Sequence, residues 1–275
     1  DLNNLTLNAS GSSDSTVSWL DSSVIRSSTD LATIMSRDPG STTAVDASTL
    51  NLTFDSNGWD NTKTGEGETS PLPSGTNTAH DWVLSNTTVQ SAGNVTLKGI
   101  GFSNSTLNIT GALNLSSDKW LTLREDTLNV TGGTMLCGTQ GVQLADLTNN
   151  SPLTVTAPEL AVSYQSGTLS NATLNISGNT TMSGQNLTLN NVTLNGETGN
   201  LSVTTGGTFT AGEKTILNSG NLSMQGNQLT LNGSTLNATG NLTLLTTQGD
   251  LNLSNATLLQ NGTGNTTLAS TGNLT

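Results

Sequence analysis

The sequence predicts an all-β protein, a right-handed parallel β-helix with about 21 residues and three short strands per coil. Three observations support this prediction. Asn, Thr, Ser and Gly make up most of the polar residues, and only 9% of the residues are charged, a composition that suits strands and turns better than helices. Aliphatic residues alternate with polar ones inside short segments, and similar segments recur at a nearly constant spacing.

The repeat is clearest between residues 171 and 275, where aliphatic positions form three ladders with steps of about 20 to 23 residues. The first ladder contains Met182, Val203, Met224, Leu244 and Leu268. The second contains Leu174, Leu194, Leu217, Leu236 and Leu258. The third is expected to contain Leu189, Phe209, Leu231, Leu253 and Leu274.

The same pattern extends back to about residue 93. TLNITGALNL and TLNVTGGTML are 21 residues apart, so Leu107 matches Leu128 and Leu115 matches Leu136. Roughly 180 residues at about 21 per coil predict 8 or 9 coils, and a regular part about 40 Å long. Because one coil cannot bury its aliphatic face alone, stacking of coils would create the core.

The chain before residue 93 is expected to differ. Residues 1–10 resemble one more β-helix strand, whereas 11–92 lack the repeat and contain three of the four Trp residues. We therefore expect 11–92 to be an irregular insertion carried on the side of the β-helix, and 93–275 to be the regular β-helix.

The insertion supplies the candidate binding residues. GWDN and HDW place aromatic rings beside carboxylate and amide groups, which suits a glycan or protein receptor. The candidates are Trp19, Trp59, Asp60, Asn61, His80, Asp81 and Trp82. The alternative is that these Trp residues pack the insertion against the β-helix and the acidic residues are solvated.

About 25 N-x-[ST] motifs occur along the chain. Outward positions of a strand lie two residues apart, so filling them with Asn, Thr and Ser creates such motifs without any selection for glycosylation. This structural explanation is favoured. The competing hypothesis is that outward residues such as Asn221 and Asn241 are glycan acceptors.

Composition argues against several function classes. The net charge of −12 disfavours nucleic acid as a partner, because phosphate binding needs a basic surface. No apolar run is long enough for membrane insertion. No cofactor and no metal site are expected, and Cys137 is expected to be a small core residue.

No catalytic residues are assigned, because the common nucleophile and metalloprotease motifs are missing. A glycosidase would need a pair of carboxyl groups on either side of the scissile bond. Glu66 and Glu68 lie in a Gly-rich and Thr-rich loop, and Glu125 with Asp126 is expected to be a solvated corner. We therefore do not expect an enzyme.

Phrases such as GNLTL and TLNATGNLTLLTTQGDLNL resemble the repeats of filamentous-haemagglutinin-like exoproteins of Gram-negative two-partner secretion, including high-molecular-weight adhesins. Autotransporter adhesin passengers are similar. The resemblance covers about residues 93–275 and implies an internal part of a long fibre that is secreted or displayed on the bacterial surface. It implies passage through an outer-membrane transporter and a cell-surface protein or glycan receptor. Because some of these adhesins are glycosylated at N-x-[ST] motifs, it also supports Asn221 and Asn241 as candidate acceptors.

The expected function is therefore that of an adhesin, in which a rigid stalk presents the insertion to a receptor. Two alternatives stay open. One is the stalk and receptor-binding region of a contact-dependent growth-inhibition exoprotein, which would recognise an outer-membrane protein of a neighbouring cell. The other is a β-helical polysaccharide lyase or hydrolase, or a phage tailspike.

Overall fold

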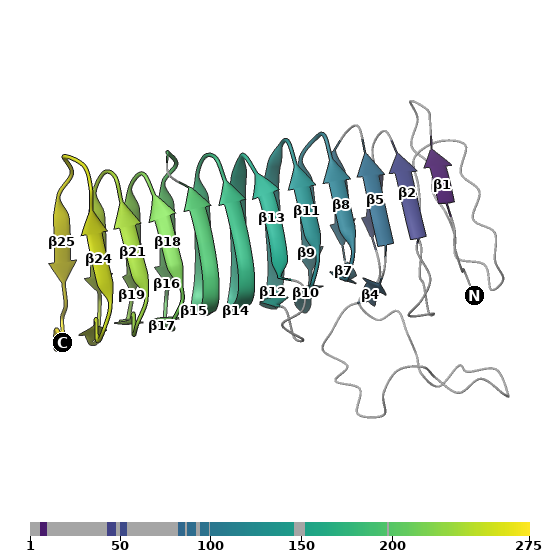
Figure 1. Cartoon of the computed structure of the whole chain (residues 1–275). Helices are drawn as coiled ribbons and strands as arrows, with labels where there is room; N and C mark the ends of the chain where they lie inside the picture. The colour runs from purple at the N-terminus through teal and green to yellow at the C-terminus, as the bar shows by residue number, and fades with distance from the viewer. Residues whose placement is uncertain are drawn as a thin grey trace, which may run out of the picture.

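The structure is a computed structural model that describes residues 6–9, 43–47, 50–53, 82–85, 87–91, 94–98, 100–145, 152–196 and 198–275. All elements in these ranges are β-strands, and each strand pairs in parallel with a strand of the next coil (Figure 1). The expected parallel β-helix is confirmed, with strands stacked about 21 residues apart in about 8 turns. In the described part of the chain, no helix is long and apolar enough to cross a membrane.

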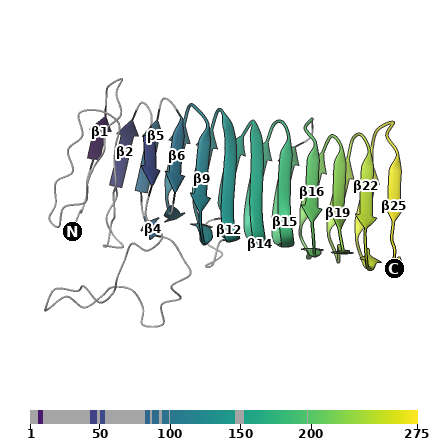
Figure 2. The same cartoon turned by 180° about the vertical axis from the view of Figure 1, so that it is seen from behind.

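Each coil contributes one strand to each of three faces, which we number in chain order. The first face, turned towards the viewer in Figure 2, contains β3 (Leu50–Thr53), β6 (Val95–Lys98), β9 (Leu113–Ser117), β16 (Leu201–Thr205), β19 (Leu222–Gly226), β22 (Leu242–Thr246) and β25 (Thr266–Ala269). The second face contains β4 (Trp82–Ser85), β7 (Ile100–Ser103), β10 (Trp120–Arg124), β17 (Thr208–Ala211), β20 (Gln228–Thr230) and β23 (Leu251–Asn252).

The third face is turned towards the viewer in Figure 1. It contains β1 (Thr6–Ala9), β2 (Thr43–Ala47), β5 (Thr87–Ser91), β8 (Thr106–Ile109), β11 (Thr127–Val130), β13 (Leu153–Ala157), β18 (Ile216–Ser219), β21 (Thr235–Ala238) and β24 (Thr257–Gln260). Three long strands bend around corners: β12 (Gly133–Ala145) spans the first two faces, and β14 (Glu159–Ile176) and β15 (Thr180–Gly196) span all three.

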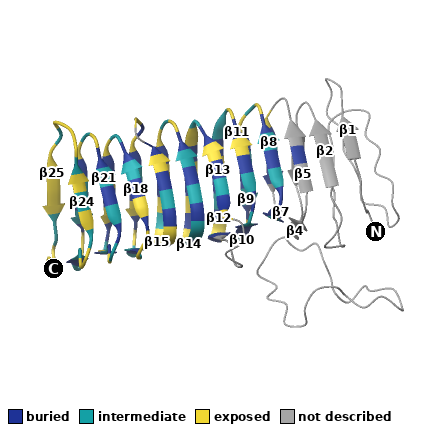
Figure 3. Cartoon of the chain, in the orientation of Figure 1, coloured by how far each residue is buried: buried dark blue, intermediate teal, exposed yellow. Residues whose placement is uncertain are grey.

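The core follows from strand alternation. In β9, β13 and β22 every second residue is buried, because successive side chains point to opposite sides of a strand. Figure 3 shows buried and more exposed positions following one another along strands of the third face, such as β13. The buried aliphatic residues form one continuous cluster along the coils. The first two ladders are confirmed pair by pair, and so are the matches of Leu107 with Leu128 and Leu115 with Leu136.

The third ladder is wrong in three of its four steps. The step from Leu231 to Leu253 continues the register of β20 with β23, but Leu274 pairs with Leu251. Phe209 pairs with Leu187 of the preceding coil and Leu229 of the following coil, whereas Leu189 pairs with Ala211. Leu229 and Leu231 are both fully buried, so each strand here has two inward positions. A shift of two residues keeps the same side chains inside, and alternation alone therefore cannot distinguish the two registers.

The corner between the second and third faces has a left-handed backbone. Every described non-glycine residue with positive φ lies in this one row, as does the one glycine for which a positive φ is recorded: Asn104, Glu125, Asn171, Asn191, Lys214, Gly233 and Asn255. Asn tolerates this conformation better than most residues. The frequent Asn at this corner is therefore explained by the turn itself.

The connections between strands are longer in the N-terminal coils. Strands β2 to β5 lie within 11–92 and pair with the solenoid, β3 with β6 and β4 with β7. Residue 99 alone separates β6 from β7, whereas the 28 residues 54–81 separate β3 from β4. Residues 54–81 are therefore inserted between two coil strands. These residues and 10–42 lie outside the described residues.

Candidate functional site

A row of Asn residues marks the corner between the third and first faces. Each of them immediately precedes the first paired residue of a first-face strand, and the side chains of Asn94, Asn179, Asn200, Asn221 and Asn241 form hydrogen bonds to the next coil or the preceding one. The Oδ1 atom of Asn179 accepts the backbone N–H of Asn200 at 3.1 Å, and Asn221 and Asn241 accept those of Asn241 and Asn265 at 2.7 and 2.8 Å. The row caps backbone donors that a corner would otherwise expose.

The row is interrupted in three consecutive coils. From one end of the described stack to the other, the corner residues are Asn94, Ala112, Gly133, Glu159, Asn179, Asn200, Asn221, Asn241 and Asn265. Ala112 and Gly133 have no side-chain amide, and a Cβ added at Gly133 would meet nothing within 4 Å. The interruption therefore leaves open space at the surface.

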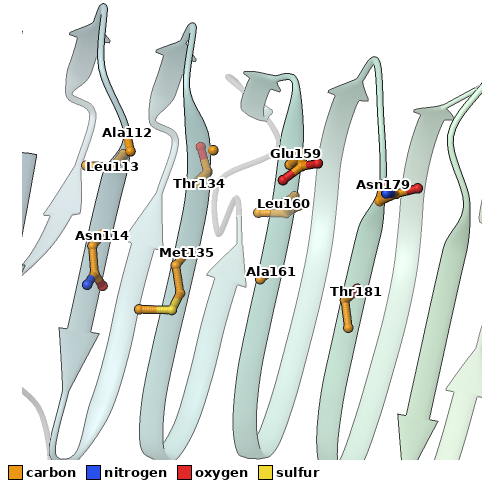
Figure 4. Close-up of a pocket in the computed structure, with 11 residues that line it drawn as sticks. Ala112, Leu113, Asn114, Thr134, Met135, Glu159, Leu160, Ala161, Asn179 and Thr181 are labelled. Carbon is orange, nitrogen blue, oxygen red and sulfur yellow. The ribbon is translucent and has the colours of Figure 1, made fainter. Parts of the chain in front are cut away.

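A groove of about 410 Å³ occupies this place. Its lining comes from four successive coils, contributed by β9, β12, β14 and β15 and the corners before them (Figure 4). Four adjacent coils extend over three steps of about 4.8 Å, or about 14 Å. The residues are Ala112, Leu113, Asn114, Gly133, Thr134, Met135, Glu159, Leu160, Ala161, Asn179 and Thr181.

Neighbouring side chains in the outward row along the groove differ greatly in size. Asn114, Met135, Ala161 and Thr181 are paired neighbours in this row. Met135 is 43% exposed, which is unusual for a large apolar side chain, and Ala161 beside it is exposed and small. The floor of the groove therefore combines a flexible thioether with a short methyl group.

One polar atom in the groove wall lacks a partner. The Oδ1 atom of Asn114 has no hydrogen-bond partner among the described residues. A buried polar atom without a partner is costly, so this atom gains from a ligand that can donate a hydrogen bond. Thr134 pairs with the core residues Leu113 and Leu160 and is only 3% exposed, so its side chain faces the core and not the groove. Exposed Glu159 adds a carboxylate, and exposed Asn179 adds an amide.

The Glu125 and Asp126 corner differs from expectation. Asp126 is fully buried, not solvated. Its two oxygens accept the backbone N–H groups of Ser105 and Arg124, both at 2.8 Å. Burial raises the pKa of the Asp126 carboxyl well above its ordinary value; the two N–H donors act in the opposite direction, and the charge of Glu125 raises it further. The two carboxyls therefore do not form an exposed catalytic pair.

Most of the candidate receptor-binding residues are not described. Trp19, Trp59, Asp60, Asn61, His80 and Asp81 lie outside the described residues, as do Glu66 and Glu68. Trp82 is the first residue of β4, where its backbone pairs with Ile100. The structure therefore does not test whether these residues form one surface, and they stay a prediction.

The candidate glycan acceptors belong to the corner Asn row. Asn221 is exposed, and its Nδ2 donates to Oδ1 of Asn200 at 2.7 Å. Asn241 is exposed as well, and its Oδ1 accepts the backbone N–H of Asn265. Both amides are thus part of the bonding between coils, and a glycan on Asn221 would leave its Nδ2 with one N–H, which the bond to Asn200 requires.

Cys137 is not a core residue. It lies in an outward row of β12 between Ser116 and Ser163 and is partly exposed. Within the described ranges, no group of three or more His, Cys, Asp and Glu side chains could hold a metal ion.

Sequence reasoning missed the groove, although a signal was present. GNTTM, GNLSV and GNLTL place Asn at the corner, whereas the equivalent segments GALNL, GGTML and PELAV do not. No family model, no curated protein and no solved structure matches the chain. The arrangement of the chain's own residues therefore has to support any functional proposal.

Proposed function

We propose that the protein is a non-enzymatic bacterial adhesin fragment, secreted or displayed on the cell surface, whose β-helix is a rigid stalk for inserted receptor-binding segments. The observation that supports this most is the insertion of 54–81 between strands that one residue connects in the next coil. Loops held by a rigid scaffold are the usual location of binding residues.

The stalk itself fits this role. From 171 to 275 the chain has only three acidic residues and one Lys, and its buried ladders continue from coil to coil. A repeat array of this kind resists bending because each coil packs on its neighbours along the whole length. The resemblance to secreted filamentous exoproteins also supports a surface location and passage through an outer-membrane transporter.

The test is a deletion designed from the strand register. Replacing residues 54–81 with a single Gly copies the connection between β6 and β7 and should leave the coils stacked. Beads coated with the unaltered chain should adhere to cultured epithelial cells, and beads coated with the deletion variant should not. Both proteins should unfold at similar temperatures.

Two outcomes would reject the proposal. Failure of the unaltered chain to adhere to epithelial cells would remove the adhesin function for this target. Equal adhesion by the folded deletion variant would show that residues 54–81, including Trp59, Asp60 and His80, do not contact the receptor.

A further inference from the structure

We propose that the groove in the interrupted Asn row is a binding site for a neutral sugar residue. The inference concerns the solenoid wall, not the inserted segments, and so goes beyond the receptor contact proposed above. It rests on the shape of the groove, on the unpartnered Oδ1 atom of Asn114 and on the charge of the groove lining.

The shape is specific to these coils. Asn occupies the corner in five successive coils from Asn179 to Asn265, and the row is missing where the groove lies. In a repeat protein the packing needs of each coil are the same, so a local departure from the repeat is not required by the fold. The departure at Ala112, Gly133 and Glu159 creates a hollow large enough for one or two sugar rings.

The polar lining favours hydroxyl donors. The unpartnered Oδ1 of Asn114 can only accept a hydrogen bond, and the carboxylate of Glu159 can only accept hydrogen bonds as well. Sugar hydroxyls donate to such groups and can at the same time accept from the amide of Asn179 or the hydroxyl of Thr181.

The apolar floor complements this lining. A pyranose ring carries C–H groups on its faces, and these would pack against the exposed Met135 side chain and the methyl group of Ala161. Asn114 Oδ1 is covered in the free protein. Met135 is the paired neighbour of Asn114 and has three rotatable bonds, so a shift of its side chain would let a sugar hydroxyl reach this oxygen.

The charge of the groove lining indicates which class of sugar would bind. Glu159 is the one ionisable residue among those that line the groove. A carboxylate repels acidic and sulfated sugars, and no lining residue is a cation that would offset this repulsion. Neutral hexoses and N-acetylhexosamines therefore fit better than sialic acid or sulfated glycans.

Binding can be measured by NMR of the methionine methyl groups. The protein with ¹³C-labelled methionine methyl groups has four methyl signals, from Met35, Met135, Met182 and Met224. Met182 and Met224 are buried in the core and serve as internal controls. Methyl glycosides of glucose, galactose, mannose and N-acetylglucosamine are titrated individually into the millimolar range, and the Met135 signal is assigned with Met135→Leu.

We expect at least one glycoside to shift the Met135 signal saturably while the Met182 and Met224 signals stay in place. Gly133→Asn restores the corner residue of the repeat, fills the groove and should abolish the shift without lowering the unfolding temperature. Glu159→Gln should weaken binding about tenfold, since loss of a hydrogen bond to a charged group costs more than loss of a neutral one. Glu213→Gln, an exposed carboxylate in another corner, should have no effect.

The proposal is overturned if no glycoside shifts the Met135 signal, or if the shift is unchanged in folded Gly133→Asn. Ala112→Asn provides a second filled variant if Gly133→Asn does not fold. Because the deletion of 54–81 leaves the groove residues in place, cell adhesion and the Met135 titration can fail separately.

Discussion

The ring of Tyr164 occupies the space that a side chain at position 184 would take. The two residues are paired neighbours in β14 and β15, and a Cβ added at Gly184 would collide with the carbonyl oxygen of Tyr164 and with Cδ2 and Cε2 of its ring. Gly138 pairs with Tyr164 from the coil on the other side, but a Cβ there would meet the backbone of Gly141 instead. The large inward aromatic residue is thus accommodated by a glycine in the following coil.

Gly184→Ala should therefore destabilise the protein by about 1–3 kcal/mol, because overpacking forces the ring or the backbone to move. Gly133→Ala is the matched control, since a Cβ at that position meets nothing within 4 Å. Urea unfolding curves of the two variants would measure the difference. Equal stability of both would contradict the packing described for Tyr164.

Tyr164→Phe should leave the protein as stable or raise its stability by about 1 kcal/mol. The Tyr164 hydroxyl is buried and has no hydrogen-bond partner among the described residues, and burial raises its pKa. Removing a buried polar group without a partner removes its desolvation cost. A loss of stability in thermal unfolding would mean that the hydroxyl is hydrogen-bonded.

Because of Asp126, the free energy of unfolding should decrease as the pH rises. Its native pKa lies well above the ordinary value, so between about 3.9 and the native pKa the folded state holds a proton that the unfolded state has released. The free energy of unfolding therefore decreases with pH across this window. The stabilising contribution of Asp126 is fully present below its unfolded-state pKa and is lost above its native pKa.

Unfolding of Asp126→Asn, measured at a series of pH values, should lack this decrease, whereas Glu213→Gln should retain it. Asn offers one acceptor oxygen in place of two, so the variant also loses one bond to Ser105 or Arg124 at every pH. The slope with pH is therefore the informative quantity. An unchanged slope in Asp126→Asn would assign the dependence to other groups.

Glu125→Asn should stabilise the protein by roughly 1 kcal/mol, because Glu125 has a φ of 58° and the left-handed region disfavours most side chains other than Gly and Asn. Asn occupies the same corner position at 104, 171, 191 and 255. The substitution also removes a negative charge beside Asp126. A lower unfolding temperature would show that contacts of the Glu125 side chain outweigh the backbone strain.

Asn221→Ala should cost about 1–2 kcal/mol, since it removes a bond to Asn200 and the cap on the backbone N–H of Asn241. Ser223→Ala, at an exposed position two residues further along β19, is the control and should be nearly neutral. The mass of the same 275 residues isolated from the native host completes the comparison. A mass near 28.1 kDa for these boundaries with a large Asn221 effect would support the structural explanation of the N-x-[ST] motifs, and added hexose masses would support glycosylation.

The amino-acid pattern along the chain is enough to predict the coil length and the side of each strand that faces inward. The 21-residue steps from Leu107 to Leu128 and from Leu115 to Leu136 predict the repeat, and strict alternation fixes the face because successive side chains point in opposite directions. The abundance of Asn, Thr and Ser follows from the same cause, since these residues cover the outward positions and turn the corners.

The register between coils and the local exceptions could not be predicted from the pattern along the chain. Phe209 pairs with Leu187 and not with Leu189 because the lengths of the corners, not the alternation, set which of two inward residues meet. Asp126 is buried because its corner position turns inward, and the groove exists because three departures from the Asn row fall in adjacent coils. Such features depend on which residues of different coils become neighbours, and a pattern along one strand does not contain that information.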